Sequence, residues 1–201
     1  MKPTELPPMP DKHTGEPRPP RAPLESDWKP DYGDRKNLSR VLQPPPGEGP
    51  VLEWRNASHG ERIFYAAFMA LAGAGIYTWK SSGFSWVGQW YLWLILIAIT
   101  VLSYLLPKND RMSAGADWFN HKGAFVKTYE LASVKITRAF VHASLDLVDR
   151  EGSKTSTNLP DIQQNRELWD LVYNGILHSV HNGAETNSQA LEQLRLRSRI
   201  R

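Results

Sequence analysis

The feature that most constrains this chain is a pair of long uncharged segments joined by a short polar turn. The first segment covers residues 63–79 and the second covers residues 84–106, and neither contains Asp, Glu, His, Lys or Arg. As helices they would extend roughly 26 Å and roughly 35 Å, against a bilayer hydrocarbon core of roughly 30 Å. We therefore expect a transmembrane hairpin over residues 53–112, with spans at about 63–79 and 84–106.

The residues around these segments predict an orientation. Lys and Arg side chains precede the first segment and follow the second, whereas the turn contributes only Lys80. This asymmetry predicts a multi-pass protein of the cell (inner) membrane, with the lipid bilayer as a partner and both termini cytoplasmic. Trp79, Trp86, Trp90 and Trp93 cluster around the turn. We expect these four rings to lie at the membrane interface, which amphipathic aromatic side chains prefer.

Small residues recur along the first segment. Ala66, Ala70, Gly73 and Ala74 fall at helical spacing, and small side chains allow a second helix to approach closely. The expected partner of this face is the other helix of the hairpin, and the alternative is a second copy of the chain in a homo-oligomer. The absence of ionisable groups from both segments argues against a pump or a proton-coupled carrier.

Proline dominates the beginning of the chain. Thirteen of the 15 prolines lie within residues 1–50, a density that opposes helix and sheet and favours extended, solvated chain. We expect residues 1–52 to form a disordered proline-rich tail. The segment Pro17–Pro20 also has the composition of a ligand for an aromatic groove on a partner.

The pattern changes again after the hairpin. Residues 125–129, 131–136 and 141–147 show partial or clean apolar alternation, which predicts strands. A turn signal at 149–152 predicts a polar fourth strand over 154–159, and neighbouring strands are expected to pair antiparallel. A helix is expected to begin after Asn165 and to end before Gly183. The sequence thus predicts an α+β membrane protein, in which a disordered tail and a transmembrane hairpin precede a small antiparallel-strand domain at 113–195 that a helix closes. The apolar face of this helix consists of Leu168, Leu171, Val172, Ile176 and Val180.

This order of parts resembles bacterial membrane proteins that carry a cytoplasmic pleckstrin-homology-like domain. Residues 123–135 and 167–180 are similar in style to small membrane proteins of actinobacteria, and the resemblance covers roughly residues 60–195. It implies seven strands before the closing helix, of which the sequence shows four. It also implies scaffolding, partner binding or contact with a lipid surface, and it supplies no catalytic residues.

Recognisable chemical motifs are missing from the sequence. Cysteine is absent, and no nucleophile elbow, phosphate-binding loop or dinucleotide fingerprint occurs. His178 and His181 have a spacing that can hold one metal ion, but ordinary helix-surface histidines are the favoured interpretation. Residues 1–62 carry ten cationic and ten anionic side chains, a balance that argues against nucleic-acid binding. We therefore expect no enzyme activity, no cofactor and no metal.

The last residues, 196–201, are expected to form a basic tail. Arginine occupies alternate positions at the end of the chain, so an extended backbone would place these side chains on one side. Such a row suits contact with an anionic lipid surface or an acidic partner. The arginines are Arg195, Arg197, Arg199 and Arg201.

Taken together, these patterns predict a membrane-anchored, non-enzymatic interaction or scaffold protein that presents a small cytoplasmic domain. One alternative is a holin-like pore-former with two spans. Another is an accessory subunit of a larger membrane complex, in which the aromatic residues pack against other subunits.

Overall fold

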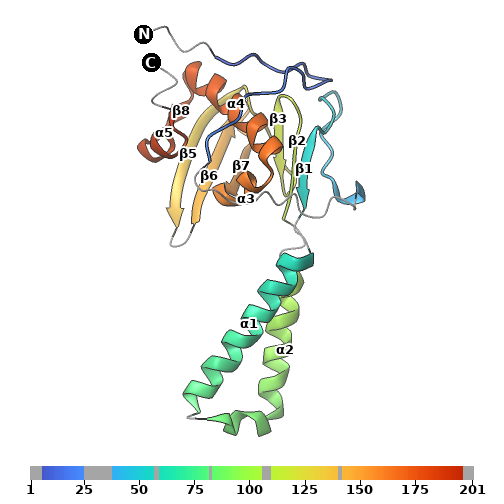
Figure 1. The fold of residues 1–201 in the computed structure, drawn as a ribbon, viewed down its shortest axis with the longest axis vertical. Helices are drawn as coiled ribbons and strands as arrows, with labels where there is room; N and C mark the ends of the chain where they lie inside the picture. The colour runs from blue at the N-terminus through green and yellow to red at the C-terminus, as the bar shows by residue number, and fades with distance from the viewer. Residues whose placement is uncertain are drawn as a thin grey trace. The chain divides into compact units, whose positions relative to one another are not determined.

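The computed structural model describes residues 6–24, 38–56, 59–81, 83–105, 110–139 and 142–196. The chain divides into two compact units (Figure 1). Residues 1–55 and 111–201 form the unit that we call the body, and residues 56–110 form the unit that we call the hairpin. The body is therefore one fold assembled from two separate stretches of sequence.

The body contains two four-stranded sheets. In the first, the strand order is β1-β2-β3-β4, and in the second it is β7-β6-β5-β8. Sequential neighbours from β2 to β4 and from β5 to β7 pair antiparallel, while β8 joins β5 in parallel. The strands are β1 (Glu53–Asn56), β2 (Arg111–Ala114), β3 (Trp118–His121), β4 (Ala124–Lys127), β5 (Leu131–Ala139), β6 (His142–Asp149), β7 (Lys154–Asn158) and β8 (Glu185–Thr186).

Helices complete the body. Strand β4 contacts β6 and β7, so the two sheets pack against each other, and the long helix α4 contacts β2 of one sheet and β5 of the other. Apolar residues from both sheets and from α4 form one buried cluster, which removes apolar surface from water and stabilises the fold. The helical elements are η1 (Leu38–Arg40), α3 (Leu159–Gln164), α4 (Arg166–His181) and α5 (Ser188–Gln193).

Strands β1, β2 and β3 were not predicted from the sequence. Each is four residues long, and all four residues of β3 are buried. A strand that is covered on both faces does not alternate apolar and polar residues. The alternation by which a half-buried strand is recognised in a sequence is therefore absent. The longer strand β6 shows the expected pattern, because Ala143, Leu145 and Leu147 are buried, whereas Ser144 and Asp146 between them are partly exposed.

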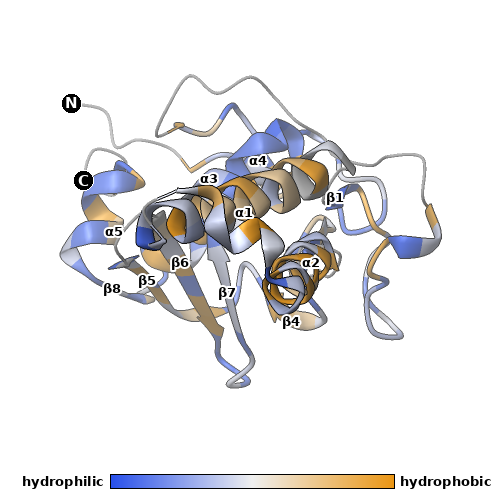
Figure 2. Cartoon of the chain, turned by 90° about the horizontal axis from the view of Figure 1, so that it is seen from below, coloured by the Kyte–Doolittle hydropathy of each residue, from blue (hydrophilic) through white to orange (hydrophobic). Residues whose placement is uncertain are grey.

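The hairpin is built from helix α1 (His59–Lys80), the 3₁₀ segment η2 (Phe84–Gly88) and helix α2 (Trp90–Leu105). The two helices contact each other along one side. In the hydropathy colouring, both helices show apolar residues among residues of intermediate hydropathy (Figure 2). Among the described hairpin side chains, the buried ones are Asn56, Ala66, Trp86 and Leu96.

The expected transmembrane spans are not found. Among the described residues, no helix combines the length and the apolar character that crossing a bilayer requires. The second apolar segment is interrupted at Gln89, whose backbone is extended, so α2 has 16 residues and a length of about 24 Å. Helix α1 is longer but rich in alanine and glycine and polar at its ends. The predicted membrane fold class, the spans at 63–79 and 84–106 and the multi-pass inner-membrane location are therefore wrong.

The amino-terminal region also differs from the expectation of a disordered tail. Residues 6–24, which we call the arm, run along helix α4 (Figure 1) and hydrogen-bond to it. Residues 38–52 also contact other parts of the body. The indole N–H of Trp118 donates a hydrogen bond to the carbonyl of Gly49, with 3.0 Å between the nitrogen and the oxygen. Proline prevents these segments from forming regular structure, but it does not prevent them from docking through their carbonyl groups.

Candidate functional site

Helix α4 provides one side of the candidate site, and local sequence explains where it begins. The side chain of Asn165 accepts a hydrogen bond from the backbone N–H of Leu168 at 3.1 Å, which satisfies a donor that a helix start leaves unpaired. One face of the helix is apolar and buried in the core. The opposite face carries polar and aromatic side chains that meet the arm, and we call this the arm-binding face. It consists of Arg166, Trp169, Asp170, Asn174 and His178.

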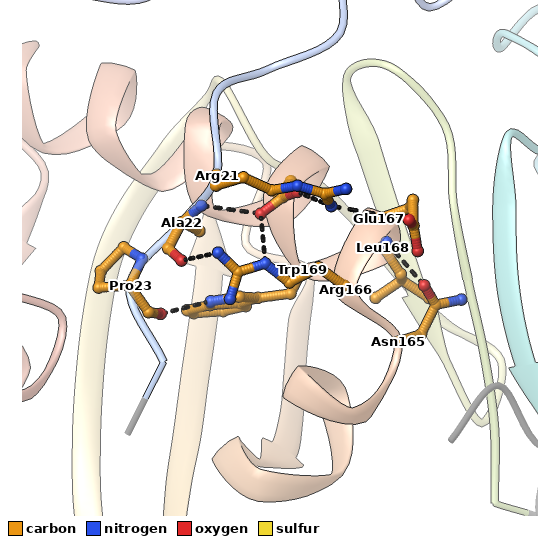
Figure 3. Close-up of polar contacts among 9 residues, drawn as sticks. Arg21, Ala22, Pro23, Asn165, Arg166, Glu167, Leu168 and Trp169 are labelled. Atoms are coloured by element: carbon orange, nitrogen blue, oxygen red, sulfur yellow. Dashed lines mark hydrogen bonds and ion pairs between the residues drawn. The ribbon is translucent and has the colours of Figure 1, made fainter. Parts of the chain in front are cut away.

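The main contacts between this face and the arm use the backbone of the arm. The guanidinium of Arg166 donates to the carbonyl of Ala22 at 2.6 Å, and the indole of Trp169 donates to the carbonyl of Pro23 at 2.9 Å (Figure 3). In the other direction, the N–H of Ala22 donates to the Asp170 carboxylate at 2.8 Å. Ala22 itself is buried in the core cluster, so this part of the arm is held by both polar and apolar contacts.

Asp170 is a buried carboxylate that pairs with the charged groups of the site. Its side chain is 6% exposed, and its Oδ2 lies 2.9 Å from the Nη1 of Arg21, while its Oδ1 lies 3.5 Å from the Nε of Arg166. Burial raises the pKa of the Asp170 carboxyl above its ordinary value, against the opposing effects of the Ala22 N–H and the two guanidinium groups. A buried carboxylate needs hydrogen-bond donors and a counter-charge. Asp170 therefore favours a bound segment that offers a backbone N–H and a cation together.

The other end of the arm is held near the last turn of α4. The amide of Asn174 donates to the carbonyl of Pro8 at 3.1 Å and to the hydroxyl of Tyr129 at 2.8 Å. The Nε2 of His178 lies 2.7 Å from the carbonyl oxygen of Pro7, and its ring is tilted by 52° against the ring of Tyr129, with centroids 5.1 Å apart. Burial raises the pKa of the Tyr129 phenol well above its ordinary range, so this hydroxyl stays protonated at neutral pH.

A hollow lies beside the ion pair of Arg21 and Asp170. Its volume is about 340 Å³, and its walls bring together charged groups of both signs. Arg18, Pro19 and Arg21 come from the arm, whereas the rest of the body contributes Glu53, Glu167, Asp170 and Leu171. The part of the wall outside the arm therefore carries three carboxylates.

The arrangement is suited to binding an extended backbone. Four side chains of one helix each contact a main-chain carbonyl of the arm, and Asp170 accepts its N–H. His178, one of the two histidines considered for a metal site, is occupied by Pro7. Within the described part of the chain, no group of three His, Asp or Glu side chains has a geometry that could hold a metal ion.

The predicted helix-packing residues lie on the side of α1 that turns toward α2. Ala66 is buried, and Ala70, Gly73 and Ala74 are partly buried. A Cβ atom added at Gly73 would lie 2.9 Å from the Cδ1 of Leu96, so the glycine allows a close approach there. The structure thus brings this face to the other helix of the same hairpin.

The four predicted interfacial tryptophans do not share one environment. Trp79 and Trp90 are 88% and 73% exposed, and Trp93 is 41% exposed. Trp86 is instead buried, where its indole donates to the hydroxyl of Thr78 at 2.9 Å and its ring lies 5.4 Å from that of Trp93. Trp86 therefore supports the turn of the hairpin from within.

The arginine tail is described only at its start. Arg195 has a positive φ of 52°, and the next residue, Leu196, is buried in the core. The predicted contact residues Arg197, Arg199 and Arg201 lie outside the described residues, and the proposed lipid or partner contact stays a prediction.

Sequence reasoning did not identify the arm-binding face. Its signal is present, because Arg166, Asp170, Asn174 and His178 recur every four residues and so share one side of the helix. A polar row of this kind is also typical of a solvated face, which is why it was not singled out.

Comparison of the chain with known protein families, with curated proteins and with solved structures gives no match.

Proposed function

We propose that this protein is a non-enzymatic interaction protein whose hairpin packs against an apolar surface of another protein. The observation that carries the proposal is the exposure of large apolar side chains. Twenty such residues are exposed on the described part of the hairpin, from Ile63 to Leu105. Contiguous apolar surface of this kind typically marks an interaction site.

The size of this surface fits a protein interface. Specific interfaces contain about 20–30 residues on each side, which is comparable with the twenty exposed apolar residues of the hairpin. These residues occur on both helices and include Leu71 at 74% and Leu102 at 57% exposure. An accessory subunit of a larger complex would use the hairpin in this way. The pore-former is not proposed, because it requires helices that cross a bilayer.

We also propose that the body is pleckstrin-homology-like. Seven strands, β1 to β7, precede the long helix α4 and are divided between two sheets. The resemblance implies seven strands and a closing helix. Six strands, β2 to β7, fall within the residues 60–195 that it covers, and β1 lies before the hairpin. The hairpin then lies in the connection between the first two strands, and the function proposed for it does not depend on catalytic groups in the body.

Site-specific photo-crosslinking in the source cells tests the function. A photoreactive residue at Leu71 or Leu102 should give adducts with another protein, because these side chains lie on the exposed apolar surface. Lys154, an exposed residue of β7, is the control position and should give few adducts. Adducts that are equally frequent at all three positions, or that contain only a second copy of this chain, would contradict the proposal.

A further inference from the structure

The arm-binding face of α4 has the chemistry of a peptide-binding site. The side chains of Arg166, Trp169, Asn174 and His178 contact carbonyl oxygens of the arm, and every extended peptide offers such carbonyls. Proline residues favour the extended polyproline conformation and lack an N–H of their own. A proline-containing segment therefore presents carbonyls without folding on itself, which is why such segments suit aromatic-lined recognition surfaces.

Asp170 adds selectivity to this main-chain recognition. It accepts the N–H of Ala22 and pairs with the guanidinium of Arg21, so the preferred ligand has an arginine followed by a residue that is not proline. Ala22 is 2% exposed, and its small side chain enters the core cluster. The position after the arginine therefore favours a small residue.

The arm fills this site incompletely. Most of its described side chains are exposed, and among them only Gly15, Pro19 and Ala22 are buried. The hollow of about 340 Å³ remains beside the Arg21–Asp170 pair. If the arm leaves, Arg18 and Arg21 leave with it, and the wall that remains carries Glu53, Glu167 and Asp170, of which Asp170 still pairs with Arg166.

We propose that the arm-binding face binds an extended, proline-containing segment of a partner protein with an arginine opposite Asp170, and that residues 7–23 of this chain occupy the site until they are displaced. This inference goes beyond the function proposed for the hairpin, because it uses a different unit of the molecule. The arm acts as an intramolecular competitor. The apparent affinity for the partner segment is reduced by the fraction of molecules whose site the arm occupies.

A competition experiment with the full-length protein tests this proposal. The probe is a fluorescein-labelled peptide with the sequence of residues 5–24, and its binding is followed by fluorescence anisotropy. The R21E variant places a negative charge beside Asp170 and should release the arm. We expect R21E to bind the peptide at least about tenfold more tightly than the wild type, which corresponds to about 1.4 kcal/mol.

M9E is the control on the same arm. It also adds a negative charge, but Met9 is 55% exposed and none of the contacts with α4 described above uses its side chain, so M9E should bind the peptide as the wild type does. Adding D170N to R21E should weaken binding about tenfold, because the arginine of the peptide then loses its counter-charge. Unfolding curves for each variant verify that the body is folded.

Two results would overturn the proposal. The first is equal peptide affinity, or no detectable binding, for folded wild type and R21E. The second is an exchange of arms between two copies, seen by sedimentation as a wild-type dimer that R21E dissociates, because the occupant would then be a second copy of this chain.

Discussion

The two units of this protein treat apolar residues in opposite ways. The body buries nearly all of its large apolar side chains, and among its described residues only Met9 and Leu38 are large, apolar and exposed. The hairpin exposes twenty and buries few. Burial of apolar surface is the main stabilising contribution to folding. The body thus obtains this contribution from its own packing, whereas the hairpin requires an external contact to obtain it.

The largest expected effect is the difference in the free energy of unfolding between two leucine-to-alanine variants, one in each unit. Leu145 of β6 is fully buried, so L145A should lower the free energy of unfolding by about 2–5 kcal/mol. Leu102 of α2 is 57% exposed, and L102A should change it by no more than about 0.5 kcal/mol in the isolated protein. Denaturant unfolding measures both. Equal losses would show that the surface of α2 is already covered within one molecule.

A second comparison uses glycines within helices. A Cβ atom at Gly175 of α4 would lie 2.5 Å from the Cβ of Thr128, whereas one at Gly75 of α1 would meet nothing within 4 Å. G175A should therefore cost about 1–3 kcal/mol through overpacking. G75A should be neutral or stabilise α1 by up to about 1 kcal/mol. If thermal unfolding shows G175A to be as stable as the wild type, the close packing of α4 is not as described.

A third comparison uses tryptophans. W169F removes the donor to the Pro23 carbonyl and also part of a fully buried ring, so it should cost more than about 1 kcal/mol, the usual contribution of one hydrogen bond. It should also speed amide hydrogen exchange at Ala22. Trp79 is 88% exposed, so W79F should change neither quantity. Unchanged exchange at Ala22 in W169F would indicate that the arm is not held by the indole.

The smallest effect concerns the buried carboxyl of the body. An NMR titration of Asp170 should give a pKa above its ordinary value of 3.8, because burial outweighs the lowering contacts of Ala22 and Arg21. R21E should raise this pKa further. Since the folded-state pKa is raised, the contribution of this carboxyl to stability is complete below pH 3.8 and is lost as the pH rises through the raised pKa. A measured pKa at or below 3.8 would contradict the expectation that burial outweighs the contacts of Ala22 and the two arginines.

The sequence predicted the parts of the structure that local patterns determine. The start of α4 follows from Asn165, whose side chain caps the helix, and the buried face of α4 follows from its apolar periodicity. The paired small residues of α1 also lie where their spacing indicates, beside α2.

Contacts between distant residues explain what the sequence did not predict. The short strand β3 exists because β2 and β4 pair with it on both sides, and no pattern within four residues indicates this. The arm is ordered because Trp169 and Arg166, more than a hundred residues away, bind its carbonyls. The extended backbone at Gln89 shortens the second apolar segment, and a count of uncharged residues cannot detect such a break.

Cysteine accessibility tests the central claim most directly, because the chain has no cysteine of its own. Single cysteines at Leu71 of the hairpin and at Lys154 of the body are treated with a water-soluble maleimide in native extract of the source cells. Both positions are exposed in the single chain. The account predicts fast labelling of K154C and slow labelling of L71C, because a partner covers the hairpin. Equally fast labelling of both positions would contradict it.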